Sequence, residues 1–428
     1  MAQEALLTRQ VVGLLAARLP ELRLDAVEDP RSERGRRWPL SCLLRTVLVG
    51  MLAGSKSLAE VETLSSELSP AVRRRLKLGG RVPDTTLRDL AVALEPEEAQ
   101  KLLRRSAQVA YRRKAMPADF PLDVVAMDGK ATGVEELDGK WAQTHRDRDG
   151  LGAYGLVRTI TCVLTSTPSR PVLECVPMGK AGNESGFFKT AFSQLLTHHK
   201  NAFDLVTYDA GANSAFNAAI VVAARKHYML ALKDERRFLM AKAISVLGHR
   251  PPEAADATSD DLLVKGRNVR VLRSLHVAEV PNGYKAMRSV RTVLRVHTRT
   301  LAGEGTVLSE ENRYFISSLP HARLSLPHWL ELVRRHWGVE TCHAVLDVSF
   351  KEDSRPWVTH SAQGMLVCLL LRRLAYNLLA LWRGRTLRTD EHRRTPWKTL
   401  FHWVARAIEQ ATDAAFLGLR ERRVLAFS

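Results

Sequence analysis

The chain of 428 residues contains few cysteines and no long uninterrupted apolar run. Its five cysteines, an odd number, stand at positions 42, 162, 175, 342 and 368, and none forms a CxxC pair. Because each lies among apolar neighbours, we predict reduced core residues rather than disulfides. No apolar run reaches the ~18 residues that a membrane-spanning helix needs. The segment Met1–Leu19 is interrupted by Glu4 and Arg9 and makes a poor signal peptide, so we expect a cytoplasmic protein.

Acidic residues are also scarce relative to basic ones. The chain has 46 Asp and Glu against 64 Lys and Arg, which gives a formal net charge of +18. Its hydrophobic content of 45% is that of an ordinary globular protein and allows a large core. A basic excess spread along the whole chain favours a polyanionic partner, most often nucleic acid, bound at several surfaces. A merely soluble basic protein is the alternative.

The spacing of apolar residues divides the chain into four parts. In residues 1–120, apolar residues recur at helical spacing, which predicts a helical N-terminal domain. Residues 121–254 predict three strands followed by strand–helix alternation, which favours an α/β sheet covered by helices. In residues 255–320, short strand-like stretches alternate with turns of Gly, Asn and charged residues, which predicts a β-rich insertion. Residues 321–428 again have the spacing of helices. We find no internal repeat and no low-complexity tract.

Basic residues gather at the edges of the first helical part and in a later segment. The groups are Arg73–Lys77, Lys101–Arg113 and residues 383–398. Each could hold the phosphates of DNA with a salt-dependent affinity, or could simply be a solvated face. Because the whole chain is basic, we expect the first helical domain to bind DNA.

The stretch Leu332–Asp353 has the apolar spacing of a helix and carries four polar residues on one face. His336, Glu340, His343 and Asp347 are spaced by four, three and four residues, so their side chains point the same way. Such a face is a solvated stripe, a metal site or a platform for a catalytic carboxylate. Zinc is disfavoured because strand-end aspartates elsewhere in the chain are better partners for Glu340. Asp347 could still assist as a second or substitute metal ligand.

Two aspartates upstream share one context. Asp128 ends an apolar strand and is followed by glycine, and Asp209 ends another and is followed by Ala-Gly. One such aspartate is usually a turn former, but ligands in open α/β sheets bind at the carboxyl ends of strands. Carboxylates from two strand ends and a crossing helix can hold two Mg²⁺ or Mn²⁺ ions, which prefer oxygen ligands. Two ions about 3.5–4 Å apart clamp the attacking and leaving oxygens of a phosphoryl displacement.

Several segments together carry a resemblance to a known group. They are Asp29–Leu40, Leu52–Gly54 and Pro83–Thr86 in the first helical part, Ala126–Lys130, Leu205–Ala210 and Tyr228–Lys233 at strand ends, and Arg335–Glu340 with His343–Asp353 in the late helix. In these motifs, nearly the whole chain resembles the DDE-type insertion-sequence transposases, in the group that includes the H-repeat-associated proteins. The chain departs from the related tyrosine–arginine–glutamate–lysine signature, with Val333, His336 and Asp347 at the corresponding spacing.

The resemblance implies a ribonuclease H-like catalytic core with an all-β insertion, preceded by the helical N-terminal domain. It implies Asp128, Asp209 and Glu340 as the catalytic triad that binds two Mg²⁺ or Mn²⁺ ions. The implied partners are double-stranded DNA, as inverted-repeat element ends and target DNA, and a second copy of the chain in a homodimeric synaptic complex on the nucleoid. The implied activity is cleavage of phosphodiester bonds and transfer of the 3′-hydroxyls to target DNA. A hairpin intermediate, a metal-dependent nuclease without strand transfer, and an inactive or domesticated DNA-binding copy all stay open.

Four further residues are candidates for DNA contacts near this triad. Lys130, Arg334 and Arg335 could bind backbone phosphates. Trp337 could stack on an unpaired base, as aromatic rings do without sequence preference, or pack in the core.

Overall fold

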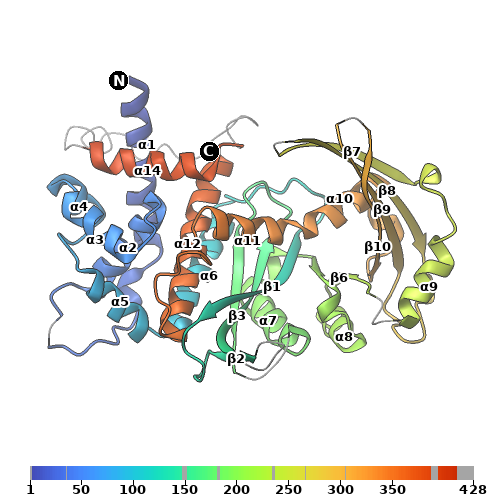
Figure 1. Cartoon of the computed structure of the whole chain (residues 1–428), viewed down its shortest axis with the longest axis horizontal. Helices are drawn as coiled ribbons and strands as arrows, with labels where there is room; N and C mark the ends of the chain where they lie inside the picture. The colour runs from blue at the N-terminus through green and yellow to red at the C-terminus, as the bar shows by residue number, and fades with distance from the viewer. Residues whose placement is uncertain are drawn as a thin grey trace.

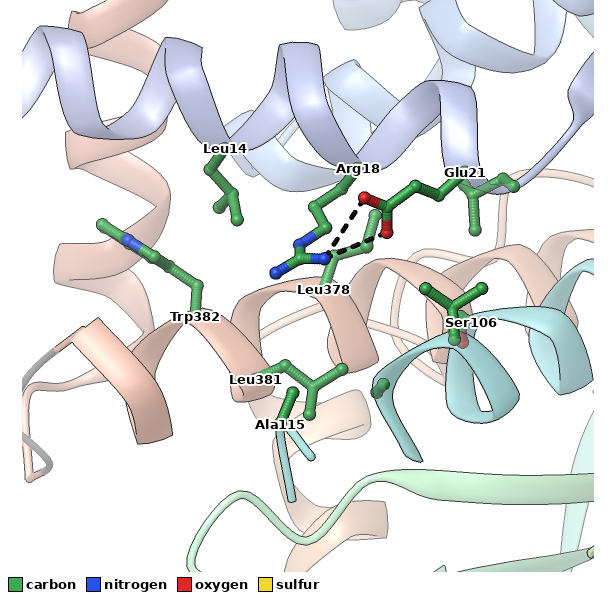
Figure 2. A pocket seen from close by; sticks show the side chains of 11 residues that line it. Leu14, Arg18, Glu21, Ser106, Ala115, Leu378, Leu381 and Trp382 are labelled. Atoms are coloured by element: carbon green, nitrogen blue, oxygen red, sulfur yellow. Dashed lines mark hydrogen bonds and ion pairs between the residues drawn. The ribbon is translucent and has the colours of Figure 1, made fainter. Parts of the chain in front are cut away.

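The structure is a computed structural model that describes residues 2–34, 36–146, 152–180, 184–233, 237–265, 267–303, 305–386 and 394–411. Three regions lie side by side along its longest axis (Figure 1). Helices from both ends of the chain form one end, a sheet with helices on its faces occupies the middle, and long curved strands form the other end. The chain is therefore mixed α/β with a large sheet, as the sequence predicts.

The first part of the chain is helical, as expected. Its helices are α1 (Ala2–Glu21), α2 (Leu40–Ala53), α3 (Leu58–Glu67), α4 (Pro70–Leu76), α5 (Asp84–Ala93) and α6 (Pro96–Arg112). Local signals set their ends. The Ser57 hydroxyl accepts a hydrogen bond from the Glu60 amide at 3.1 Å, which satisfies a free N–H group at the start of α3. Gly54 ends α2 at a φ of 84°, a conformation that glycine adopts without strain.

One ten-stranded sheet runs through the middle and far regions. Its strands are β1 (Val124–Val134), β2 (Gln143–Arg146), β3 (Ala153–Leu164), β4 (Val172–Met178), β5 (Leu205–Tyr208), β6 (His227–Ala231), β7 (Ala257–Lys265), β8 (Arg267–Glu279), β9 (Thr292–Leu301) and β10 (Val307–Ser317). Their order is β2-β3-β1-β5-β6-β10-β9-β8-β7, and β4 pairs with β3. Strands β1, β5 and β6 are parallel to one another, and the other pairs are antiparallel.

The β-rich segment predicted as an insertion belongs to this same sheet. Strand β10 pairs with β6 of the middle region, with Phe315 opposite Ala231 and Ser317 opposite Met229. Its other edge pairs with β9, and β8 and β7 follow outward. Hydrogen bonds therefore join the insertion to β6, which in turn pairs with β5, the strand that leads to Asp209.

Helices cover both faces of the middle of the sheet. On one face lie α7 (Glu184–His199), α8 (Ala215–Ala223) and α9 (Arg237–Leu247), and on the other lie α10 (Leu326–His336), α11 (Gly338–Val348) and α12 (Ala362–Thr386). Side chains of a strand alternate between faces. Accordingly, Val125 and Met127 of β1 pack with α7, whereas Ala126 packs with α11 and Val124 with α10.

The last helices share one core with the first ones. Helix α12 packs on α2, α5 and α6, and α14 (Trp397–Gln410) crosses α1 and α2, as Figure 1 shows. Buried polar groups reinforce the contact, since the Asn377 side chain of α12 donates a hydrogen bond to the Ser106 hydroxyl of α6 at 3.2 Å. The apolar segment Ala362–Gly384 is long enough to cross a membrane, but 94% of its apolar 18-residue window is buried inside the protein, as in a central core helix.

The prediction of one continuous helix over Leu332–Asp353 is wrong. The structure divides it into α10 and α11 at Trp337 and Gly338. The reason is a close contact with the sheet: a Cβ on Gly338 would lie 2.6 Å from Cγ2 of Thr165. His336 and Glu340 therefore lie on separate helices, but His336, Glu340 and His343 still face the same two strands.

Candidate active site

The two aspartates predicted at strand ends lie at the same level of the sheet, but only Asp209 follows the end of its strand. The prediction is wrong for Asp128, which lies inside β1 because that strand continues to Val134 along β3. Strands β1 and β5 are parallel, with Ala126 opposite Thr207, and this register extended by two residues places Asp128 level with Asp209. Neighbouring strands are about 4.8 Å apart. Because side chains alternate, both aspartates lie on the sheet face that α10 and α11 cover.

Glu340 comes to this place from the first turn of α11. The helix is held against the sheet by Val339, Cys342 and Leu346, which belong to the same buried cluster as Ala126 of β1. Burial and the charge of Asp128 raise the pKa of Glu340, with a smaller contribution from Asp209. The structure thus brings Asp128, Asp209 and Glu340 into one electrostatic neighbourhood.

Two histidines line the same place. His343 Nδ1 lies 3.3 Å from Oδ2 of Asp128, so the imidazole fixes the orientation of that carboxylate. Its Nε2 is buried without a hydrogen-bond partner among the described residues. His336 lies deeper, with Nδ1 3.0 Å from the Thr207 hydroxyl, and burial lowers its pKa. Both rings are therefore neighbours of the carboxylates rather than part of a separate zinc site.

Asp209 is held by its own turn. One carboxylate oxygen accepts a hydrogen bond from the Gly211 amide at 2.8 Å, at the start of a short 3₁₀ turn, η3 (Ala210–Ala212). The other lies 3.8 Å from the Lys233 ammonium, whose side chain is 61% exposed. The small residues after Asp209 allow this turn, and the free side of the carboxylate faces solvent.

A second acidic cluster lies at the far end of α11. Asp347, Glu352 and Asp353 bring carboxylate oxygens within 4.8 Å of one another, which is close enough to hold a metal ion. However, the Lys130 ammonium bonds the carboxylates of Asp347 and Asp353 and lies 3.8 Å from Glu352. Glu352 also pairs with Arg373 at 3.0 Å in a fully buried contact. Two cations already compensate this cluster, so its geometry is that of a structural ion network.

Lys130 and Arg335 are placed otherwise than the sequence predicts for phosphate contacts. Both side chains are only 8% exposed. Lys130 serves the acidic cluster, and Arg335 bonds Asp119 at 2.8 Å while its guanidinium lies over the Phe120 ring. Each charge is therefore buried with an internal partner, and the phosphate contacts of these two side chains stay predictions.

Arg334 and Trp337 stay accessible in part. Arg334 is 36% exposed and bonds Asp261 at 3.0 Å. The Trp337 ring, which is half-buried, lies 5.4 Å from the guanidinium of Arg273 and 5.6 Å from that of Arg313. Sequence reasoning missed both of these arginines, because nothing in their spacing links strands β8 and β10 to the late helix.

The close approach at Gly338 gives a test of how Glu340 is positioned. In Gly338→Ala, the new methyl group meets the buried Thr165 side chain, so α11 must shift away from the sheet. We expect the free energy of unfolding to fall by about 1–3 kcal/mol, as for other overpacked sites. Urea denaturation measures it, and Gly133→Ala, where an added Cβ meets nothing within 4 Å, is the matched control. Equal stability of the two variants would contradict this account.

Comparison with known proteins bears on the helical part of the chain. Residues 22–106 match the family DDE_Tnp_1-associated. The resemblance to DDE-type transposases is confirmed. The match spans α2 to α5 and most of α6, where three of the resembling segments lie, and it ends before the carboxylates of the candidate site.

The comparisons with solved structures and with curated proteins give weaker findings. Among solved structures, a cryo-EM structure of a piggyBac transposase synaptic complex with hairpin DNA matches with a TM-score of 0.45 and 10% sequence identity, over 98% of this chain and 82% of that one. No curated protein matches the chain.

Proposed function

We propose that this chain is a DDE-type DNA transposase whose active site is formed by Asp128, Asp209 and Glu340. The observation that carries the proposal is the meeting of these carboxylates, from two adjacent parallel strands and a helix, on one face of the sheet. The transposase-associated match of residues 22–106 supports it. So does the net charge of +18, which suits a DNA-binding protein acting on the nucleoid in the cytoplasm.

The core around the site suits a ribonuclease H-like fold. Strands β4, β3 and β1 are antiparallel neighbours, and β5 and β6 continue the sheet in parallel with β1. Helices lie on both faces, and the β-rich segment enters between the second aspartate and Glu340. We infer that fold from this order of strands and from the sequence motifs.

The donor set fits divalent cations. Three carboxylates offer hard oxygen ligands, and the raised pKa of Glu340, caused by burial and by Asp128, marks negative charge that internal cations do not fully balance. The oxygens of Asp128, Asp209 and Glu340 need not lie as close together as ligands of a single ion, because two ions about 4 Å apart are ligated from opposite sides. When bound, two Mg²⁺ or Mn²⁺ ions supply the positive charge that activates a nucleophile and stabilises the leaving oxygen of a phosphodiester.

The residues of the chain have separable tasks in this site. Asp128 and Asp209 hold their carboxylates at a fixed separation, because their strands are hydrogen-bonded neighbours. His343 orients Asp128, and Glu340 closes the site from α11. One such site can serve cleavage and strand transfer in turn, since both are displacements at phosphorus. Binding of two inverted-repeat ends then calls for a homodimer.

The test uses a supercoiled plasmid that carries the chromosomal DNA flanking the coding sequence. With Mg²⁺, the purified chain is expected to release the flanked segment and to join its 3′ ends to a second DNA. Cut DNA without joined products would indicate a nuclease. DNA binding with no cut DNA from either the wild type or Asp128→Asn would indicate an inactive or domesticated copy.

Metal binding should also appear in the stability of the free protein. A carboxyl group whose folded pKa is raised stabilises the fold when protonated and loses that contribution as pH rises through the raised value, so the metal-free site is strained near neutral pH. Mg²⁺ at about 100 times its dissociation constant should add about 2.7 kcal/mol. Thermal unfolding measures this as a higher midpoint. Glu340→Gln should lose most of the shift and Asp353→Asn should keep it, and the reverse would place the metal at the second acidic cluster.

A further inference from the structure

Arginines gather where the β-rich insertion meets the late helices. Arg273 of β8 and Arg313 of β10 both lie within 6 Å of the Trp337 ring centre, at the break between α10 and α11. Arg334 of α10 joins them through Asp261, which it shares with Arg273 at 3.0 and 2.6 Å. We call Arg273, Arg313 and Arg334 the arginine junction.

The charges of the arginine junction lie close to one another, and Arg334 has a further partner in Glu331, at 3.6 Å. Burial lowers the pKa of Arg273, and the charges of Arg334 and Arg313 lower it further, so the three guanidiniums repel one another. Asp261 serves two of them. The carboxylate that pairs with Arg313 among the described residues is Glu311, at 2.8 Å, and both side chains are about half exposed. Such an exposed pair contributes little, so Arg313 can exchange Glu311 for another anion at small cost.

Arg313 lies on the same face of the same sheet as the two aspartates. Phe315 of β10 packs in one cluster with Val124 of β1 and Leu205 of β5, and alternation puts Arg313 on the face of Phe315. The registers of β5, β6 and β10 place Asp209, Ala231 and Phe315 level with one another. The backbone of Arg313 thus lies two strand spacings, about 10 Å, to the side of Asp209. It also lies two residues, about 6.5 Å, beyond the ends of β5 and β6.

The electrostatic field of Arg313 reaches the site. Its positive charge opposes the effect of burial and of Asp128 on the pKa of Glu340, and it also acts on the pKa of His336. Arg313 therefore offers a half-exposed guanidinium beyond the ends of β5 and β6, within electrostatic reach of Glu340, where a DNA strand that brings a phosphate to the three carboxylates could meet it. Guanidinium groups bind phosphates through two parallel hydrogen bonds.

We propose that Arg313, delivered by the insertion, binds the phosphate of the DNA strand that is cut at the Asp128–Asp209–Glu340 site. The insertion then completes the active site. This inference rests on the proposed function. Arg273 and Arg334 keep the junction basic, and Trp337 provides the surface against which the Arg313 guanidinium lies.

The experiment compares Arg313→Ala and Arg313→Lys with a matched control. Arg299→Ala is that control, because Arg299 lies on β9 of the same insertion, is also 46% exposed, and also has a neighbouring glutamate, Glu310 at 3.8 Å. Two probes are used: the supercoiled plasmid with the flanking DNA for Mg²⁺-dependent cleavage, and a fluorescent DNA duplex of arbitrary sequence for binding at several salt concentrations. Urea midpoints equal to that of the wild type confirm that each variant folds.

Arg313→Ala should slow cleavage about 100-fold, as loss of one preorganised donor at a reacting centre does. It should also lower the slope of log affinity against log salt by about one phosphate contact. Arg313→Lys should restore the salt slope and only part of the rate, because an ammonium cannot make the paired hydrogen bonds. Arg299→Ala should match the wild type in both measurements.

The outcomes separate this inference from the proposed function. If the wild type cuts, Asp128→Asn does not, and Arg313→Ala behaves as Arg299→Ala does, Arg313 has no such role while the transposase assignment stands. If neither the wild type nor Asp128→Asn cuts, the proposed transposase activity is refuted. The slope of log affinity against log salt then still decides whether Arg313 binds a phosphate. A slope lowered in Arg313→Ala alone supports phosphate binding by Arg313, and an unchanged slope overturns it.

Discussion

Asp128→Asn is expected to abolish Mg²⁺-dependent DNA cleavage, with a loss of about 10³-fold or more. The substitution keeps the size of the side chain but removes one anionic ligand from the site formed by Asp128, Asp209 and Glu340. Charge stabilisation by metal ions at a phosphoryl centre is worth several kcal/mol, and each 1.36 kcal/mol is a factor of ten in rate. The measurement is the single-turnover rate on the supercoiled plasmid.

The matched control for this loss is Asp353→Asn. Asp353 belongs to the second acidic cluster and is 48% exposed, against 25% for Asp128, so its carboxylate is more open to a cation than that of Asp128. Its partner is Lys130, at 3.0 Å, and its loss should leave most of the rate. Should Asp353→Asn lose the activity while Asp128→Asn retains it, the catalytic metal would belong at the second cluster and the proposed triad would be wrong.

Arg373→Met is expected to lower the free energy of unfolding by about 3–5 kcal/mol, the cost of breaking a buried ion pair on one side. Arg373 and Glu352 are both fully buried and pair at 3.0 Å. Although burial disfavours a charged guanidinium, Glu352 holds the pKa of Arg373 above its ordinary value. Without Arg373, the ion-pair partner left to the Glu352 carboxylate among the described residues is Lys130, at 3.8 Å.

The neighbouring arginine provides the control for that variant. Arg372 is also buried but bonds the backbone carbonyls of Glu352 and Arg355, and it pairs with no carboxylate at hydrogen-bond distance among the described residues. Adding Glu352→Gln should therefore restore more of the stability lost in Arg373→Met than of that lost in Arg372→Met, because Glu352 pairs directly with Arg373 and acts on Arg372 only through its charge. Urea denaturation of the single and double variants gives these differences, and equal rescue of both would show that the charge of Glu352 is not what Arg373 compensates.

Local pattern predicts the candidate site better than it predicts the surroundings of that site. An apolar run that ends in Asp and a small residue is visible in sequence, and Asp128 and Asp209 do end up level on one sheet face. Glu340 is found from a helical motif. The catalytic role of the three carboxylates stays a prediction, since the structure shows their positions and not their activity.

What the sequence does not predict depends on contacts between distant segments. The break before α11 comes from the contact of Gly338 with Thr165, far upstream. The burial of Lys130 depends on Asp347, 217 residues later. The pairing of β10 with β6, which brings Arg313 toward the site, is likewise invisible to spacing rules, because strand periodicity shows which face a residue takes but not which strand lies beside it.

The shared core of the first and last helices sets the order in which the chain can fold. Helices α1 to α6 leave the ribosome first, yet their buried surface is completed by α12 and α14, which are made last. Contacts of such sequence separation form late, because a long loop must close before they contribute. The early helices therefore wait with apolar surface exposed while the whole sheet is synthesised. A chain that stops before α12 lacks that partner, and its transposase-associated domain has an unfinished core.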